Sequence, residues 1–115
     1  MKNITFENFE EEVLNSVKPC IVVFKHDGCY LCRGLTSVIH KLRRKYLEDF
    51  KFGFVNTFSE EYLTDYFAVD GVPTMFIFVD GDGREIEYPE NPNPLSGYSE
   101  KYLIGYIEDN FFQNE

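Results

Sequence analysis

Two cysteines separated by two residues are the part of this sequence best suited to chemistry. Cys29 and Cys32 follow an apolar run over residues 20–24 and precede a long amphipathic segment. This pattern predicts a strand, a turn opened by Gly28, and a helix whose first turn carries both sulfur atoms. Residues three apart on a helix lie on one face, with β-carbons about 5–6 Å apart. A disulfide spans α-carbons about 4.4–6.8 Å apart, so the pair can close or open with little backbone movement.

The predicted position of Cys29 favours its ionised form. The first N–H groups of a helix lack backbone acceptors and lie at the positive end of the helix dipole, so both stabilise a thiolate there. His26 and Asp27 precede the motif. A protonated His26 would favour the thiolate and an Asp27 carboxylate would oppose it, and the sequence does not decide the net sign. We interpret Asp27 as an exposed polar residue that closes the strand.

A structural zinc site is the alternative to redox chemistry for this cysteine pair. Zinc takes four ligands, and the other Cys and His residues of the chain are only Cys20, His26 and His40. Cys20 begins the predicted strand, roughly 20 Å from the motif at about 3.3 Å per residue. We therefore expect no metal and no organic cofactor, only the redox-active disulfide itself, and interpret Cys20 as a small buried residue.

Composition predicts one globular domain over residues 1–115. Hydrophobic residues make up 43% of the chain and include 12 Phe, which is enough for a packed core. The net charge of −9 argues against a nucleic-acid partner. We interpret the one basic run, residues 41–45, as a solvated helix face rather than a docking patch for an acidic partner.

The sequence also predicts a cytoplasmic protein without a membrane partner. No run approaches the ~20 apolar residues that a membrane span needs. The N-terminus becomes acidic at Glu7 without the hydrophobic core of a signal peptide. Three cysteines are also too few, and an odd number, for a secreted disulfide framework.

Hydrophobic periodicity and turn residues divide the chain into alternating helices and strands. We expect a helix from an N-cap at Thr5 to Pro19, a strand over 20–25, a helix from the motif to about Asp49, a strand over 50–57, a short helix capped by Ser59, a strand over 75–79, a turn over 80–83, a strand over 84–88 and a last helix capped by Ser99. Between the last strand and helix, three prolines make residues 89–97 an extended loop. The strand–helix–strand unit around the motif implies two parallel strands joined by a right-handed crossover.

This element order, with Gly71-Val72-Pro73-Thr74 opening the third core strand, resembles the thioredoxin superfamily over nearly the whole chain. The resemblance implies an α/β protein with the thioredoxin fold, a central mixed β-sheet of about four to five strands flanked by four helices. It also implies that Pro73 is cis and lies against the cysteine pair, leaving the backbone of Val72 free to pair with an extended substrate. A trans proline at a strand start is the alternative.

The resemblance assigns the two cysteines different roles. Cys29 would attack a substrate disulfide as a thiolate, and Cys32 would be the buried thiol that resolves the mixed disulfide. Gly97 would lie near the small residues beside the active-site groove, with loop residues 89–98 forming one wall of it and narrowing the choice of substrate.

The chain departs from thioredoxins proper at several positions. Gly28 stands where they carry Trp, and Tyr30 and Leu31 stand between the cysteines in place of Gly-Pro. We expect Tyr30 to supply the flat apolar contact of the missing Trp. Val23 occupies the position of a buried acid, so Cys32 must lose its proton to water or to a neighbour such as His26 or Asp27.

From these observations we expect a thioredoxin-like thiol–disulfide oxidoreductase that reduces protein disulfides as a monomer. Its electrons would come from a reductase or a low-molecular-weight thiol. Two alternatives remain open at this point. One is an oxidase or isomerase of the same fold. The other is an adaptor that binds a protein partner across Tyr30, Val72 and the proline loop with little turnover.

Overall fold

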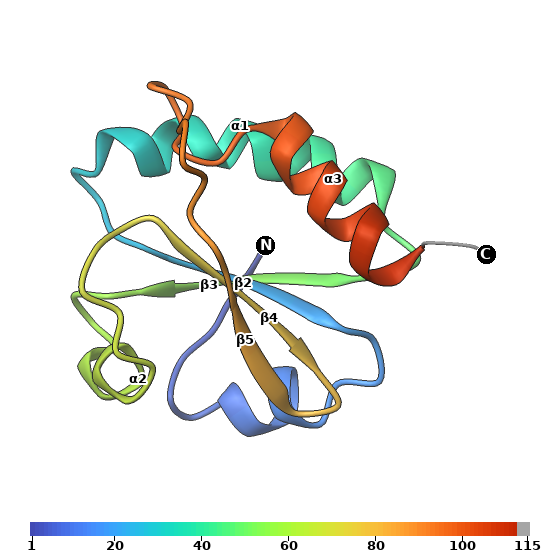
Figure 1. Ribbon diagram of the computed structural model, residues 1–115. Helices are drawn as coiled ribbons and strands as arrows, with labels where there is room; N and C mark the ends of the chain where they lie inside the picture. Colours follow the sequence, from blue (N-terminus) through green and yellow to red (C-terminus); the bar gives the residue numbers. More distant parts are fainter. Residues whose placement is uncertain (113–115) are drawn as a thin grey trace.

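A five-stranded mixed β-sheet forms the centre of the structure, a computed structural model that describes residues 1–112 (Figure 1). Its strands are β1 (Lys2–Asn3), β2 (Cys20–Lys25), β3 (Lys51–Asn56), β4 (Thr74–Val79) and β5 (Asp82–Ile86). They lie in the order β1-β3-β2-β4-β5. The first three run parallel, β4 is antiparallel to β2, and β5 is antiparallel to β4.

Helices cover both faces of the sheet. Figure 1 shows α1 (Tyr30–Lys45) and α3 (Glu100–Phe111) together above the sheet, with α2 (Glu61–Tyr66) and the five-residue π-helix η1 (Glu10–Leu14) below it. This arrangement confirms the expected α/β class, the thioredoxin fold and the number of strands and helical segments. The single-domain prediction over 1–115 extends to residues 113–115, which lie outside the described residues.

Strand β2 separates two hydrophobic cores because its side chains alternate between the two faces. Ile21 and Val23 pack with α1 and α3, whereas Val22 and Phe24 pack with η1 and α2. The first five residues of β2 are all buried. The apolar run without clean alternation was therefore a correct signal for a central strand covered on both sides.

The expected helix from Thr5 to Pro19 is wrong in its extent. Thr5 does cap a turn, since its Oγ1 accepts from the N–H of Asn8 at 3.3 Å, but η1 spans only Glu10–Leu14. The chain then turns at Asn15 to reach β2, so Val17 is 97% exposed instead of packed. The regular spacing of apolar residues in this segment continues past Leu14, where the helix ends, so the spacing alone overstated the length of the helix.

Several other boundaries differ from the expectation. The short strand β1 was not predicted, and α1 ends at Lys45 rather than near Asp49. Ser59 does not cap α2. Asn56 Oδ1 at the end of β3 accepts from the N–H groups of Phe58 (2.9 Å) and Ser59 (3.3 Å) in the turn before the helix, and the N-cap residue Glu60 makes no side-chain cap bond.

The turn between β4 and β5 is shorter than expected. Asp80 and Gly81 both have positive φ, which matches the twist of a two-residue hairpin turn, so β5 begins at Asp82. By contrast, Ser99 caps α3 as predicted, accepting from Tyr102 N at 3.0 Å. Within residues 1–112 no helix combines the length and the apolar character that a membrane crossing requires.

Tyr98 joins the end of the proline loop to the β4–β5 hairpin. Its ring is completely buried, and its hydroxyl accepts from Met75 N–H at 3.1 Å and donates to the Ile86 carbonyl at 3.2 Å. Met75 and Ile86 are paired residues at the end of the β4–β5 ladder. Burial raises the pKa of Tyr98 to about 12.

We predict that Tyr98→Phe lowers the free energy of unfolding by about 1–3 kcal/mol, because it leaves buried Met75 N–H without an acceptor. A tyrosine with a raised folded-state pKa stabilises the fold fully below its ordinary value of 10.0 and loses that contribution as the pH rises through about 12. Urea unfolding from pH 8 to pH 12 should therefore show a smaller loss above pH 10 in Tyr98→Phe. Tyr66→Phe, at an exposed position, is the control and should match the parent protein at every pH. Equal stability of Tyr98→Phe and the parent at pH 8 would contradict this role.

Candidate active site

The N-terminus of α1 holds both sulfur atoms of the motif. Cys29 is the N-cap of this helix, with extended backbone angles, and its Sγ accepts a hydrogen bond from the N–H of Cys32 at 3.1 Å. Gly28, at φ +85°, makes the turn that aims the chain into the helix, a conformation that few other residues adopt. An N-cap sulfur next to free helix N–H groups is in the setting that stabilises a thiolate.

Cys29 and Cys32 form a disulfide with their Cα atoms 5.2 Å apart. Cys29 is partly exposed, whereas Cys32 is 3% exposed. The Thr36 hydroxyl donates to the Cys32 carbonyl one turn later, at 3.0 Å. The pair therefore consists of one accessible and one covered sulfur, the geometry that sequential attack and resolution require.

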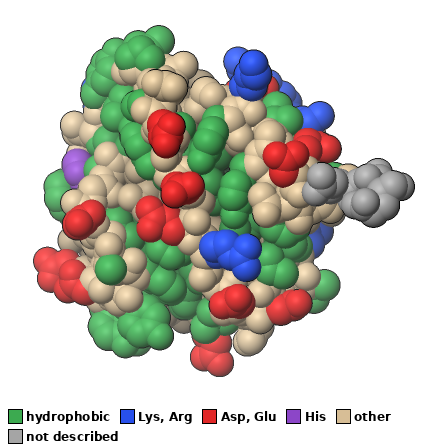
Figure 2. Space-filling model, in the orientation of Figure 1, with side chains coloured by type: hydrophobic (Ala, Val, Ile, Leu, Met, Phe, Trp, Pro, Cys, Tyr) green, Lys and Arg blue, Asp and Glu red, His purple; other side chains and the backbone are tan. Residues whose placement is uncertain are grey.

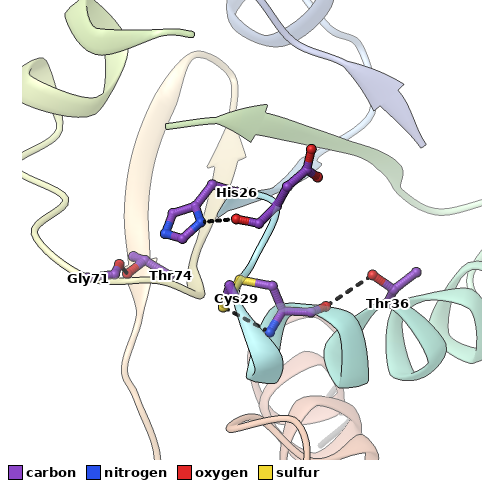
Figure 3. The surroundings of a disulfide bond; sticks show 7 residues. His26, Cys29, Thr36, Gly71 and Thr74 are labelled. Atoms are coloured by element: carbon purple, nitrogen blue, oxygen red, sulfur yellow. Dashed lines mark hydrogen bonds between the residues drawn. A yellow bond between two sulfur atoms is a disulfide. The ribbon is translucent and has the colours of Figure 1, made fainter. Parts of the chain in front are cut away.

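The segment from Gly71 to Thr74 lies beside the motif because β4 starts where β2 ends. The register pairs Thr74 with Phe24, near the C-terminal end of β2. The Val72–Pro73 peptide bond is cis, Pro73 is buried and Val72 is partly exposed. The Thr74 hydroxyl donates to the Gly71 carbonyl at 2.6 Å and closes this turn (Figure 3).

His26 belongs to the same surface. Figure 3 shows its ring on the side of the disulfide where Gly71 and Thr74 lie. Its Nδ1 is 2.6 Å from the carbonyl oxygen of Asp27, and a carbonyl can only accept, so Nδ1 donates this hydrogen bond and Nε2 is the nitrogen that accepts a proton in the neutral ring. The ring stacks on Phe58, with centroids 4.1 Å apart. Phe58 is 67% exposed and was not among the predicted site residues.

The remaining predicted site residues also lie around the motif. Tyr30 is 60% exposed and Leu31 partly exposed, so both project from the first turn of α1. Asp27 is exposed, consistent with its interpretation as a polar residue at a strand end. Val23 is buried within the apolar core below the helix, so no acid lies at that position.

The proline loop folds back onto α1 close to the motif. The carbonyl oxygen of Leu95 lies where a side chain on Gly34 would begin, so only glycine permits this approach. Asn93 pairs with Gly97 and holds the tip of the loop closed. Gly97 itself is buried against the Tyr88 hydroxyl, whereas Leu95 is 62% exposed.

Gly34 and Phe58 are therefore residues of this surface that sequence reasoning missed, whereas Leu95 was expected there only as part of the loop over residues 89–98. A glycine inside a strongly amphipathic helix was the available signal for Gly34, because such a glycine costs stability unless something lies close to it. Leu95 carried no local signal, since its place depends on how the loop folds.

A metal would need more ligands than this site gathers. Within residues 1–112, no group of three or more His, Cys, Asp and Glu side chains is arranged to hold a metal ion. Cys20 lies in the core on the other face of the sheet, with η1 and α2. Burial raises the pKa of the Cys20 thiol to about 11, so it stays protonated near neutral pH.

Comparisons with known proteins agree on one family. The thioredoxin family model matches residues 1–99. A thioredoxin of Rickettsia bellii is 29% identical over 108 residues, covering 94% of this chain and 96% of that protein. A thioredoxin of Griffithsia pacifica is 32% identical, covering 64% of this chain and 68% of that protein. The chloroplastic thioredoxin-like protein HCF164 of Arabidopsis thaliana is 35% identical over 77 residues, which cover 65% of this chain but only 29% of that longer protein.

We predict that Gly34→Ala destabilises the protein by roughly 1–3 kcal/mol, because the new methyl group overlaps the Leu95 carbonyl and displaces the loop. Gly105→Ala in α3 is the matched control. Nothing lies within 4 Å of that position, so removing a helix-interior glycine should stabilise the protein by about 0.5–1 kcal/mol. Thermal unfolding of both variants measures the two signs. Equal stabilisation by both substitutions would show that the loop does not rest on Gly34.

We also predict a strict order of thiol reactivity in the reduced protein. Iodoacetamide at pH 7 should alkylate Cys29 first, because it is the accessible N-cap sulfur, while buried Cys32 and Cys20 react at least ~10-fold more slowly. Mass spectrometry of peptides over time measures the three rates. Cys29→Ser should remove the fast phase and leave the slow ones. Comparable rates for Cys20 and Cys29 would contradict the assignment.

Proposed function

Because the chain belongs to the thioredoxin family, we propose that it reduces protein disulfides by dithiol–disulfide exchange at Cys29 and Cys32. The family and the cysteine pair support thiol–disulfide oxidoreductase chemistry in general. The proposal adds the direction, reduction of the substrate. The observation that carries the exchange chemistry is the asymmetry of the pair, an accessible N-cap cysteine next to a buried one, and the reduction potential tests the direction.

The exchange needs two steps that conserve electrons. The Cys29 thiolate attacks one sulfur of the substrate disulfide, the substrate S–S bond breaks, and the departing sulfur takes a proton from solvent. Cys32 then loses its proton and attacks Cys29 Sγ, which breaks the mixed disulfide and releases the second substrate thiol. The protein is left with the Cys29–Cys32 disulfide, and the substrate has gained two electrons.

The proton of Cys32 needs an acceptor outside the apolar core. Val23 cannot take it, so we propose that it passes to water or to His26, whose Nε2 is free because Nδ1 binds the Asp27 carbonyl. Thr36 does not compete for this role, since its hydroxyl already donates to the Cys32 carbonyl.

A substrate chain would lie across the surface around Cys29. We propose that it pairs with the backbone of Val72, next to Pro73, and contacts the exposed side chains of Tyr30 and Leu95. Gly97 contributes by allowing the loop to turn rather than by touching the substrate, because it is buried. In this arrangement the proline loop limits which protein disulfides fit.

The proposal also includes the location, oligomeric state, cofactors and electron donor of the protein. We propose a cytoplasmic monomer that needs no metal or organic cofactor and draws its electrons from a reductase or a low-molecular-weight thiol. Nucleic acid and membrane are not partners in this proposal. The match covers less than a third of the chloroplastic relative, so that protein's location and its additional segments give no support to this proposal.

The reduction potential of the Cys29–Cys32 pair tests the direction of the reaction. We predict a single two-electron transition near about −270 mV on equilibration with a dithiothreitol or glutathione series, as for thioredoxin-type reductants. A value near about −120 to −180 mV would move the assignment to an oxidase or isomerase. No reversible transition would favour the adaptor.

Trapping of the intermediate is the control for this measurement. Cys32→Ser, incubated with a protein disulfide, should accumulate a mixed disulfide on Cys29, whereas Cys29→Ser should accumulate none. Turnover should be abolished in both variants. Continued turnover by Cys29→Ser would contradict the assigned roles of the two cysteines.

A further inference from the structure

A groove of about 840 Å³ lies on the face of the sheet away from α1, and neither Cys29 nor Cys32 lines it. Its walls come from η1 with the residues before it, from α2, and from the β4–β5 turn. Figure 2, drawn in the orientation of Figure 1, shows hydrophobic side chains exposed at the lower left, in the region of α2, with carboxylates close by. None of the redox chemistry above uses this surface.

The floor of the groove is a packed set of phenylalanine rings. Phe9, Phe67 and Phe78 contact one another with ring centroids 5.5–5.6 Å apart. Gly83 lies directly against the Phe78 ring, so the hairpin adds no side chain above the floor at that position. The floor is therefore fixed by the core and needs no rearrangement to be available.

Three more aromatic rings stand exposed along the α2 side of the groove. Phe6 is 57% exposed, Tyr62 61% and Tyr66 70%. Phe6 packs edge-on against Tyr62 at 5.0 Å, and Tyr62 stacks on Tyr66 at 6.2 Å, so the three form one connected row. The N–H of Phe6 donates to the Glu60 carboxylate at 2.9 Å, which ties this row to the start of α2. A connected row of large exposed rings marks an interaction surface rather than scattered surface residues.

The negative charge of the groove favours a positively charged ligand. Glu7, Glu10 and Asp82 line it and are exposed, and no lysine or arginine is among the described residues that line it. Within residues 1–112 none of these three carboxylates forms an ion pair. Cations bind both to such carboxylates and to the faces of aromatic rings, and the two effects act together where rings and carboxylates adjoin.

We propose that this groove is a docking site for a basic polypeptide segment of a partner protein. Lysine or arginine side chains of that segment lie over the rings of Tyr62 and Tyr66 and pair with Glu10 and Asp82, while its aliphatic groups cover the phenylalanine floor. A partner bound here leaves Cys29 free. The proposal does not depend on the direction of the thiol chemistry.

A second copy of this chain is the less favoured occupant. Each copy carries a net charge of −9, so two copies repel one another, and the groove is itself acidic. The basic run at residues 41–45 is the one segment that a second copy could offer, and self-association is therefore an outcome of the test.

The test uses a fluorescein-labelled ten-residue peptide of alternating Arg and Leu. Its matched control replaces each Arg by citrulline, which keeps the shape and removes the charge. Fluorescence anisotropy should show saturable binding of the Arg peptide, at least ~10-fold tighter than the citrulline peptide and weakened in about 0.5 M NaCl.

Variants locate the binding on the protein. Tyr62→Ala/Tyr66→Ala and Glu10→Gln/Asp82→Asn should each weaken binding by roughly 10-fold, whereas Tyr62→Phe/Tyr66→Phe should retain it because the rings remain. Leu47→Ala and Glu48→Gln/Asp49→Asn, exposed positions away from the groove, are the controls and should bind like the parent protein; the second removes the same two charges as Glu10→Gln/Asp82→Asn. Circular dichroism checks that every variant is folded, and Cys29→Ser should bind the peptide unchanged.

Four results would overturn the proposal. Equal binding of the two peptides would show an apolar contact without charge selection. Equal weakening by Glu48→Gln/Asp49→Asn would show a general effect of net charge. Absence of saturable binding up to about 1 mM peptide would show that the groove does not bind basic peptides. Sedimentation that detects self-association through the groove, lost in Tyr62→Ala/Tyr66→Ala, would assign the surface to a second copy.

Discussion

The burial of β2 on both faces is the constraint that positions the rest of the site. This strand pairs in parallel with β3 and antiparallel with β4, so three chain segments meet at its C-terminal end. The cysteine motif leaves β2 there, Phe58 follows the end of β3, and Pro73 precedes the start of β4. A shift of β2 by one residue would turn its apolar side chains to the opposite cores and separate these segments.

The residue types of β2 and β3 place apolar side chains beneath the cysteine helix. Val23 pairs with Phe54, so two apolar side chains lie side by side where the strand approaches α1. The ammonium group of Lys25 lies 4.5 Å from the Phe54 ring centroid and ends this apolar stretch. The electrostatics at Cys29 therefore depend on the end of α1 and on His26 and Asp27 near the surface, rather than on an ionised group at position 23 in the core.

The sequence predicted correctly the features that depend on residues close together in the chain. The cysteine spacing, the apolar face of α1 and the Ser99 cap were correct because each depends on residues within a turn of one another. The predicted cap of α2 was wrong because Asn56, at the end of the preceding strand, holds Phe58 and Ser59 in a turn before the helix. Helix α2 therefore begins at Glu61, and its N-cap residue Glu60 makes no side-chain cap bond. The contact of Leu95 with Gly34 joins segments about sixty residues apart, and the aromatic groove joins three, so the sequence alone could not predict either.

Tyr98 connects the proline loop to the β4–β5 hairpin through its buried side chain. Its backbone ends the proline loop, and its hydroxyl is held between Met75 on β4 and Ile86 on β5. Ser96 Oγ donates to the Tyr98 carbonyl at 2.7 Å, so the loop cannot pivot freely at this residue. A displacement of the loop at Leu95 would therefore have to break the contacts of a buried ring that is bonded to the strand after Pro73. The loop on one side of the cysteine pair and the strand on the other are thus joined through one buried side chain.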